Sequence, residues 1–458
     1  MQKLKHLLGI GDSKFYRTML AICLPIMLQQ GLSSALYMID NIMVGQLGET
    51  AISAVGVANQ LTFLLQIFGM GISGGAGVFA AQYWGRKDIA GIRRVQGIAL
   101  GLSLVVGVLF TCAGLFFAQP IASIFSHDPA VIDLAVSYLS IASYGYLFQM
   151  VALVLCVILR ASGDSVLPLK ATAAAVLVNG VFNYIFIFGK LGLAPMGVRG
   201  AALATVIASV VNAGVLVFIS YRKRNAAAAS LKEMTNFDGR MLGSFAKVSG
   251  PVFINEALWS LGITMYSVLY GILGTKPQAA MQIYTTIDRL GFVLMAGLGS
   301  ACGVLVGNLI GAGETEKARL YSKRMMIISP LSVGIIGILL QFAAPLFMKL
   351  FAVEPDVSEM AMEVVRIYCG VLWIYALNFT IIVGTLRAGG DTIYATITDV
   401  CGLWAVSLPL AFFTGLVLNW PLWAIFAVTV AGDLTKSVMG LLRVRTGKWI
   451  RVLQDPDE

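Results

Sequence analysis

The side chains of this chain that could bind a cation are the few acids and amides that interrupt its long apolar stretches. Asp40 is the only acid in the first stretch, while Asn179 and Asn183 lie four residues apart in the fifth, on one face of a helix. Thr205 adds a hydroxyl near the start of the sixth stretch. A carboxylate, two carboxamide oxygens and a hydroxyl suit a hard monovalent cation, or a proton that titrates the acid. We therefore expect a cation site at these four residues.

Each of these residues also has a purely structural interpretation. Asp40 could cap the outer end of its helix, and each amide could hold neighbouring helices together. An ionisable side chain at the centre of a membrane helix costs about 2.5–3.5 kcal/mol on insertion scales, which favours a functional role for Asp40. The four residues come from three stretches and lie at a similar depth, which favours function for the whole set.

Three further acids in the second half are candidates for a cation or substrate site. Glu256 and Asp399 each lie about one helical turn into an apolar stretch, the seventh and the eleventh. Glu256 could equally be stabilised by the positive end of its own helix. Asp288 is followed by Arg289, so it could form a structural ion pair instead. Glu256, Asp288 and Asp399 are our candidates for this second site.

Twelve apolar stretches must position these residues. Hydrophobic residues make up 58% of the 458-residue chain and charged residues 12%, whereas soluble domains contain roughly 45–50% and 25%. About 20 apolar residues cross a hydrocarbon core as a helix. We predict an all-α integral membrane protein whose twelve transmembrane helices form two pseudo-symmetric six-helix bundles around a central cavity. The predicted spans are 18–45, 52–82, 95–118, 133–158, 166–188, 200–220, 249–273, 278–310, 325–348, 361–386, 393–415 and 421–442.

The second half of the chain repeats the first. The string LRASGDS at 159–165 recurs 227 positions later as LRAGGDT at 386–392. Because each half has six spans, the second half re-enters the membrane with the orientation of the first, and the repeat axis lies along the membrane normal. We predict an N-terminal lobe, 1–230, that ends in a cytoplasmic linker, and a C-terminal lobe, 231–458.

The repeated strings themselves fall in short cytoplasmic turns. Gly163 and Gly390 permit a tight backbone, and Asp164 and Asp391 are placed to cap the next helix. The alternative is a loop that binds phosphate, but the lysine of a P-loop does not follow either string. We expect both turns to be structural joints.

Basic residues orient the spans. They concentrate before the first span, after the second, sixth and eighth, and after the last, and the positive-inside rule makes that side cytoplasmic. This distribution explains the net charge of +9 better than binding to nucleic acid does. We expect a multi-pass protein of the bacterial cytoplasmic (inner) membrane with both termini in the cytoplasm. Residues 1–11 are expected to form a short interfacial helix.

Enzymatic chemistry finds no support in the sequence. The only histidines are His6 and His127, and no set of nucleophile and base is available. The six cysteines are isolated within predicted spans, so we interpret them as small core residues rather than disulfide partners or metal ligands. We expect no enzyme, no metal centre and no cofactor.

The chain resembles the multidrug and toxic compound extrusion (MATE) exporters over essentially its whole length. The resemblance is carried by the two six-span repeats and by four segments: LP at 24–25, MIDNIMVG at 38–45, NYIF at 183–186 and GAALAT at 200–205. It implies a secondary active antiporter that exports organic, cationic and amphipathic compounds in exchange for Na⁺ or H⁺. Transport would proceed by alternating access, with the lobes rocking about the joint 221–240.

The resemblance also implies that Asp40, Asn179, Asn183 and Thr205 form the site of the coupling cation. The sequence departs from the family at Asn183, where some members carry a second acid, and at Trp259, where some carry an acid in the seventh span. The middle of the tenth span, 372–380, holds no charge.

Two other functions stay open at this point. A flippase for lipid-linked precursors would need a cationic cavity, yet few bases other than Arg289 lie within the spans. A passive channel would not depend on an ion gradient. In each case we expect a monomer that contacts membrane lipid and binds no nucleic acid.

Overall fold

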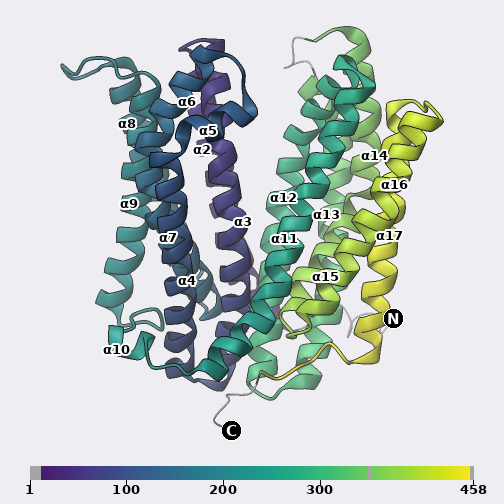
Figure 1. Cartoon of the computed structure of the whole chain (residues 1–458). Coiled ribbons are helices and arrows are strands. Elements are labelled where there is room, and N and C mark those ends of the chain that lie inside the picture. The colour runs from purple at the N-terminus through teal and green to yellow at the C-terminus, as the bar shows by residue number, and fades with distance from the viewer. Residues whose placement is uncertain (1–11, 349–352, 454–458) are drawn as a thin grey trace. The chain divides into compact units, whose positions relative to one another are not determined.

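The computed structural model describes residues 12–348 and 353–453, and these residues are almost entirely helical (Figure 1). Twelve of their helices are long and apolar enough to cross a membrane. Within this part of the chain the extended backbone is limited to one isolated bridge between Gly390 and Ile450. The prediction of an all-α membrane protein with twelve spanning helices is confirmed. The interfacial helix expected for residues 1–11 lies outside the described residues.

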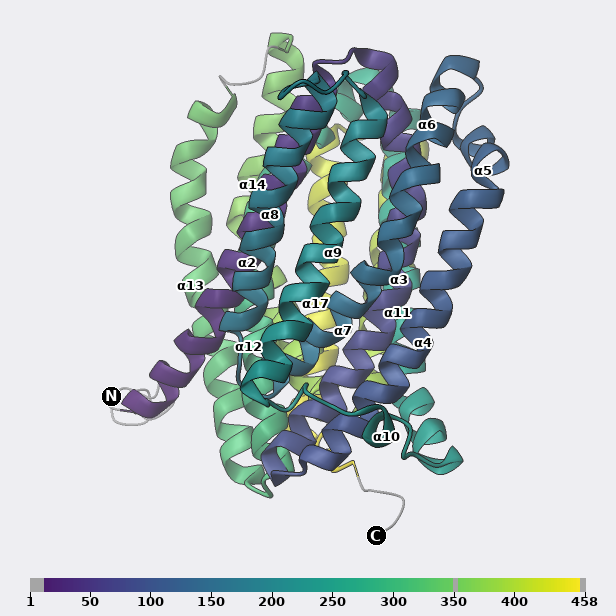
Figure 2. The same cartoon turned by 90° about the vertical axis from the view of Figure 1, so that its left-hand side faces the viewer.

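Six spanning helices come from the first half of the sequence, and a short helix α5 precedes the fourth of them. Pro129 begins the fourth, where the missing N–H of proline costs no helical hydrogen bond. Figure 2 shows α4, α7, α8 and α9 of this half side by side. The elements are α2 (Ser13–Gly45), α3 (Glu49–Arg86), α4 (Ile89–Phe116), α5 (Ala118–Phe125), α6 (Pro129–Ala142), η1 (Ser143–Gly145), α7 (Tyr146–Ala161), α8 (Val166–Phe188) and α9 (Val198–Lys223).

The other six spanning helices follow the short helix α10 (Leu231–Met234). The tenth and eleventh spanning helices are interrupted by π-helical segments. In a π-helix each backbone N–H bonds to the carbonyl oxygen five residues earlier, rather than four as in an α-helix. The elements are α11 (Gly239–Leu273), α12 (Thr275–Gly311), α13 (Thr315–Met348), α14 (Pro355–Phe379), η2 (Thr380–Arg387), α15 (Thr392–Val400), η3 (Cys401–Ser407), α16 (Leu408–Phe412), η4 (Phe413–Val417) and α17 (Leu422–Thr446).

The spanning helices extend beyond the apolar stretches that predicted them. The second predicted span ended at residue 82, whereas α3 continues to Arg86. The fourth began at residue 133, whereas its helix starts at Pro129. Apolarity marks only the part of a helix that lies in the hydrocarbon core, and the ends continue into polar surroundings.

The described residues group into two compact units. The N-terminal unit comprises residues 28–84 and 88–253, and the C-terminal unit comprises residues 12–27, 85–87, 254–348 and 353–453. Two helices pass from one unit to the other near their middle, α2 after Met27 and α11 after Phe253, and α3 passes only with its last residues, Gly85 and Arg86. The passages in α2 and α11 each follow a proline inside the helix by two residues, Pro25 and Pro251. The division into lobes at 230 and 231 stays a prediction.

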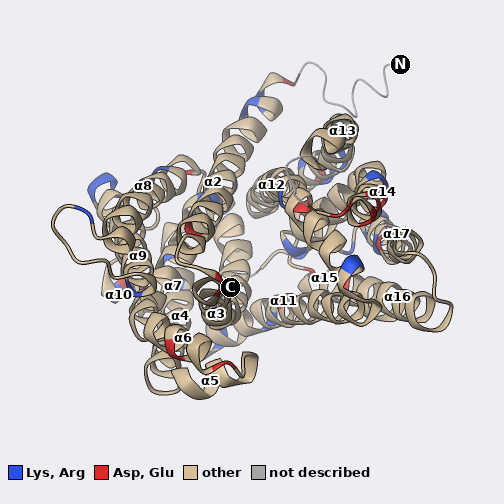
Figure 3. Ribbon diagram, turned by 90° about the horizontal axis from the view of Figure 1, so that it is seen from above, with Lys and Arg blue, Asp and Glu red and all other residues tan. Residues whose placement is uncertain are grey.

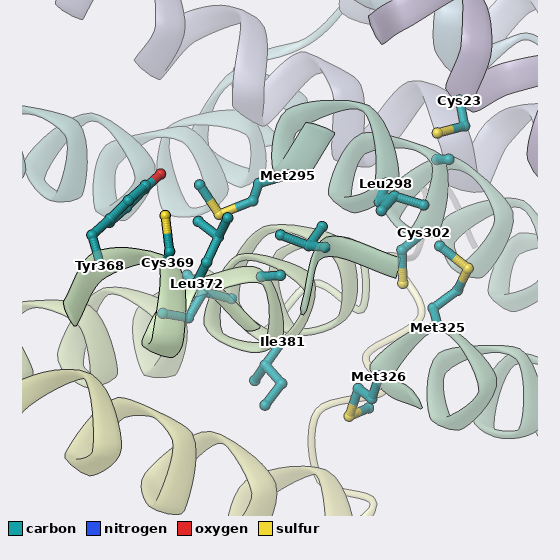
Figure 4. Close-up of a cluster of buried hydrophobic side chains, with 14 of the residues drawn as sticks. Cys23, Met295, Leu298, Cys302, Met325, Met326, Tyr368, Cys369, Leu372 and Ile381 are labelled. Carbon is teal, nitrogen blue, oxygen red and sulfur yellow. The ribbon is translucent and has the colours of Figure 1, made fainter. Parts of the chain in front are cut away.

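The C-terminal unit has a core rich in sulfur-containing side chains. Met295, Cys302, Met325 and Cys369 are buried among Leu, Ile and Tyr side chains of α12, α13 and α14 (Figure 4). Methionine is flexible and fills irregular gaps between helices. The interpretation of the cysteines as core residues is correct for Cys23, Cys156, Cys302 and Cys369, but wrong for Cys112, whose side chain faces outward from α4.

The linker between the halves is packed onto the N-terminal unit. Gln96 of α4 is buried and donates to the backbone oxygen of Ala227 at 3.0 Å. Arg93 of α4 pairs with Glu233 of α10. Ser230 and Glu233 form a reciprocal capping box, in which each side chain bonds the backbone N–H of the other. Most of the linker therefore belongs to the surface of one unit.

Candidate functional site

Asp40 and the two asparagines of α8 form one hydrogen-bonded group in the N-terminal unit. The amide nitrogen of Asn183 donates both to Asp40 Oδ1 and to Asn179 Oδ1, the latter at 2.7 Å. The spacing of four residues puts the two amides on one face of α8, as the sequence predicted. Both asparagines are 1% exposed, so their polar atoms depend on partners inside the protein.

Tyr138 and Thr205 complete the surroundings of this group. The Thr205 hydroxyl donates to the backbone oxygen of Ala201 one turn earlier in α9, at 3.0 Å, and so keeps its lone pairs available. Tyr138 of α6 is buried and lies within electrostatic reach of Asp40 and beside the Thr205 hydroxyl. The sequence did not point to Tyr138, because an aromatic residue in an apolar span is usually part of the core.

One buried oxygen in the group has no hydrogen-bond donor. Asn183 directs its nitrogen to two acceptors, and its own Oδ1 has no partner within the described part of the chain. A buried carbonyl oxygen without a partner costs about 1–3 kcal/mol. A monovalent cation beside Asp40 would satisfy this oxygen as a ligand, and a protonated Asp40 would satisfy it as a donor. The arrangement can therefore hold one positive charge.

A second polar group of the N-terminal unit involves the repeated turn. Arg160, the arginine of the first string, donates to Gln29 Oε1 at 2.6 Å. Gln29 Nε2 in turn donates to Thr172 Oγ1 at 2.9 Å. The side chain of Gln29 thus connects the first, fourth and fifth spanning helices, one residue after α2 has entered this unit.

The C-terminal unit contains the same connection at the equivalent positions. Arg387, the arginine of the second string, donates to Asn255 Oδ1, and Asn255 Nδ2 donates to Asp399 Oδ2 at 2.8 Å. Arg387 also pairs with Glu256 at 2.8 Å. In the repeat Asn255 corresponds to Gln29, and Asp399 corresponds to Thr172. We call each of these chains of arginine, amide and acceptor a relay.

The second relay continues into a charged cluster on α17. Lys436 Nζ lies 2.9 Å from Asp399 Oδ1 and 3.6 Å from Asp433 Oδ1. Asn378 of α14 donates to the backbone oxygen of Asp433 at 2.9 Å and accepts from Ser437 at 2.7 Å. The charged members of this cluster are Glu256, Arg387, Asp399, Asp433 and Lys436.

The predicted second site is therefore partly assembled. The structure brings Glu256 and Asp399 together through Asn255 and Arg387. Asp288 lies on α12, where the Tyr368 hydroxyl donates to its backbone oxygen at 3.4 Å, and among the described residues it forms no ion pair with the cluster.

Asp433 and Lys436 were missed by the sequence analysis. The signal was present, because two charges three residues apart interrupt an otherwise apolar span, and an ionisable residue there indicates function by default. Figure 3 shows how few Lys, Arg, Asp and Glu residues colour the helices, which makes such a pair informative.

The repeated turns have the same backbone but different partners. Gly163 and Gly390 adopt φ values of 86° and 84°, and the backbone N–H of the aspartate that follows bonds five residues back in both copies. Asp164 accepts from the N–H of Leu167 at 3.0 Å and caps the next helix as predicted. For Asp391 this prediction is wrong, because its buried carboxylate pairs with Arg443 at 2.7 Å and Arg451 at 2.8 Å.

The comparison with protein families finds one match that covers both halves. A family model described as MatE matches residues 25–185 and 251–413. The matched segments begin at Pro25 and Pro251, which agrees with the repeat found in the sequence.

Relatives and solved structures agree with this match. A probable multidrug resistance protein NorM of Thermotoga maritima is 26% identical over 434 residues, which cover 94% of this chain and 93% of the relative. Multidrug and toxin extrusion protein 1 of Homo sapiens is 28% identical over 409 residues, which cover 86% of this chain and 68% of the relative. A crystal structure of MATE in complex with MaL6 superposes with a TM-score of 0.85 at 20% identity, covering 98% of both chains. This chain therefore belongs to the MATE family of multidrug efflux transporters.

Proposed function

We propose that the protein is a secondary active antiporter of the bacterial cytoplasmic membrane, with both termini in the cytoplasm. It exports organic, cationic and amphipathic compounds in exchange for Na⁺ or H⁺ by alternating access. The observation that carries this proposal is the buried Asn183 Oδ1, which has no donor in the described structure and lies beside the carboxylate of Asp40. Family membership supports the transport of small molecules.

Asp40 carries the coupling charge in this proposal. Without the ion its carboxylate is held by a neutral amide in an apolar span, whereas a bound Na⁺ or H⁺ neutralises it and satisfies Asn183. An ion can drive the cycle only by binding the two access states with different affinities. Because Asp40, Asn183 and Tyr138 lie on three helices, a change in their separation would alter that affinity.

The test measures efflux of ethidium from proteoliposomes under a sodium gradient and a proton gradient imposed separately. The substitution Asp40→Asn should abolish the efflux that the coupling gradient drives and leave passive leakage unchanged. Asp133→Asn, which removes a carboxylate from an exposed position of α6, is the matched control and should retain transport. If Asp40→Asn retained ion-driven export, the coupling site would be wrong.

The same measurement separates the two other functions. A channel would pass ethidium down its own gradient without either ion gradient, and a flippase would move a pyrophosphate-linked lipid rather than a cation. In the C-terminal unit the charges favour an exporter of cations over such a flippase, because Arg387 and Lys436 are both paired with acids and supply no excess positive charge.

A further inference from the structure

The charged cluster of the C-terminal unit carries more acids than bases. Glu256, Asp399 and Asp433 are three carboxylates, and Arg387 and Lys436 are two cations. The charged side chains are 12–14% exposed, so they are largely removed from water. One negative charge is left over when all five groups are ionised.

The excess charge is located at the end of the cluster that contains Lys436. Arg387 is engaged by Glu256 at 2.8 Å and by Asn255, so it is committed to the first acid. Lys436 is the cation that contacts both Asp399 and Asp433, and it lies 3.6 Å from the latter, beyond a normal hydrogen bond. The two carboxylates therefore share one ammonium group.

Asp433 has few other donors. The amide nitrogen of Asn378 bonds the backbone oxygen of Asp433 at 2.9 Å and lies 3.4 Å from its carboxylate, which makes the second contact weak. Asn378 is itself 5% exposed and fixed by Ser437, so it cannot move closer without losing that bond. The carboxylate of Asp433 is thus held in position, but both of its contacts are longer than a normal hydrogen bond.

Lysine is suited to act as a movable occupant of such a site. Its ammonium is a compact point charge on a flexible four-carbon stem, unlike the planar and rigid guanidinium of arginine. Rotation about such a stem moves the charge without requiring the helix backbone to move. Arg387 is held by two partners at once and cannot leave in this way.

We propose that Asp399 and Asp433 bind the positively charged group of an organic monocation, and that the Lys436 ammonium occupies this position as a tethered competitor when no substrate is bound. The inference rests on the proposed function, since it names the residues that receive its substrate. The lysine prevents two neighbouring carboxylates from standing unpaired in an apolar span between transport events. Substrate binding then exchanges one cation for another, and release restores the internal pair.

The test measures binding of tetraphenylphosphonium to the purified full-length protein by equilibrium dialysis. Lys436→Met removes the competitor and should tighten binding about tenfold, equivalent to about 1.4 kcal/mol. Asp433→Asn should weaken binding by a similar factor. Lys247→Met, which removes the same charge from an exposed position of α11, is the matched control and should stay within about twofold of the parent protein.

A second comparison keeps the test valid if Lys436→Met alone does not fold. The double variant with Lys436→Met and Asp433→Asn has the same net charge as the parent cluster, and it should bind the probe about tenfold more tightly than Asp433→Asn alone. Binding that is unchanged or weaker on removal of Lys436 in both backgrounds overturns the proposal. Retention of ion-driven export by Asp40→Asn would instead overturn the proposed function, and it would leave this binding result unaffected.

Discussion

The two halves of the chain contain the same relay but supply it with different charge. In the N-terminal unit Arg160, Gln29 and Thr172 hold one formal charge among three side chains. In the C-terminal unit the equivalent of Thr172 is Asp399, and the equivalent of Gln30 is Glu256. The duplicated framework is therefore common to both units, and the residues that differ between the copies decide which charges each unit carries.

The helices around the two relays differ as well. Within the described residues the π-helical segments η2, η3 and η4 all lie in the second half. Arg387 ends η2, and η3 begins two residues after Asp399. Single π-turns are frequent at functional sites, because the wider turn displaces a side chain from the regular helical position. In the N-terminal unit the polar groups lie on α-helices, and the irregular helical segment of that unit is the short 3₁₀ helix η1.

The largest expected difference between the copies comes from removal of the relay arginine. Arg387→Met leaves Glu256 without its cation and the Asn255 oxygen without its donor, and should destabilise the fold by about 3–5 kcal/mol. Arg160→Met leaves only the neutral oxygen of Gln29 without a donor and should cost about 1–3 kcal/mol. Unfolding in mixed micelles, followed by circular dichroism, measures both values, with Arg222→Met as an exposed control. Equal losses of stability in the two variants would mean that Arg387 does not stabilise Glu256 as proposed.

A smaller difference is expected at the aspartate of the repeated turns. Asp391→Asn removes a fully buried charge that pairs with Arg443 and Arg451, and should cost about 2–4 kcal/mol. Asp164→Asn should change stability by only a few tenths of a kcal/mol, because asparagine caps a helix about as well as aspartate. The same unfolding measurement compares them. A large loss in Asp164→Asn would show that the first turn has a charge-dependent partner.

Both glycines of the turns should be sensitive to replacement by alanine, and Gly390 should be the more sensitive. Gly163→Ala and Gly390→Ala each place a Cβ in the left-handed region, which costs about 1–2 kcal/mol. At Gly390 the new Cβ would also lie 3.0 Å from the backbone oxygen of Arg451, whereas at Gly163 the nearest atom is 4.0 Å away. The thermal midpoint of Gly390→Ala should therefore fall further. A larger fall for Gly163→Ala would contradict the packing of the C-terminal segment.

The smallest effect is expected at the linker, and it depends on pH. Hydrogen bonds from the Ser230 backbone and hydroxyl, and then from Arg93, lower the pKa of Glu233 to about 2 from an ordinary value of 4.5. A lowered pKa in the folded state stabilises the docked linker fully above the unfolded value, and the contribution is lost as the pH falls from 4.5 towards 2. Glu233→Gln should remove this dependence.

Amide exchange of residues 224–238, corrected for intrinsic rates at each pH, tests this expectation. Protection in the parent protein should stay constant from pH 7 to about pH 5 and then decrease. Protection that decreases between pH 7 and 5 would contradict the assigned pairing with Arg93.

The cation group at Asp40 could be predicted because each of its members carries a signal within its own helix. A lone acid in an apolar span and two amides four residues apart are visible without knowledge of the fold. Thr205 was added from its depth, and the structure places it beside Tyr138 rather than in a direct bond to the amides.

The relays could not be predicted because they join residues 131 and 143 positions apart. The arginines of the repeated strings were visible, but the turns were interpreted as joints because nothing local shows where a long side chain ends. The partners of Asp391 come from the end of the chain and depend on how residues 447–453 pack. Local sequence specifies helices and caps, whereas pairing across helices is decided by tertiary packing.

The passage of α2 and α11 between the units has a consequence for how far each half of the sequence depends on the other. Each unit receives half of its first helix from the other half of the sequence, so a chain cut within the linker would yield two fragments that each lack a segment of their own core. Each half of the sequence therefore supplies part of the unit that the other half mainly forms, and neither half contains a complete unit.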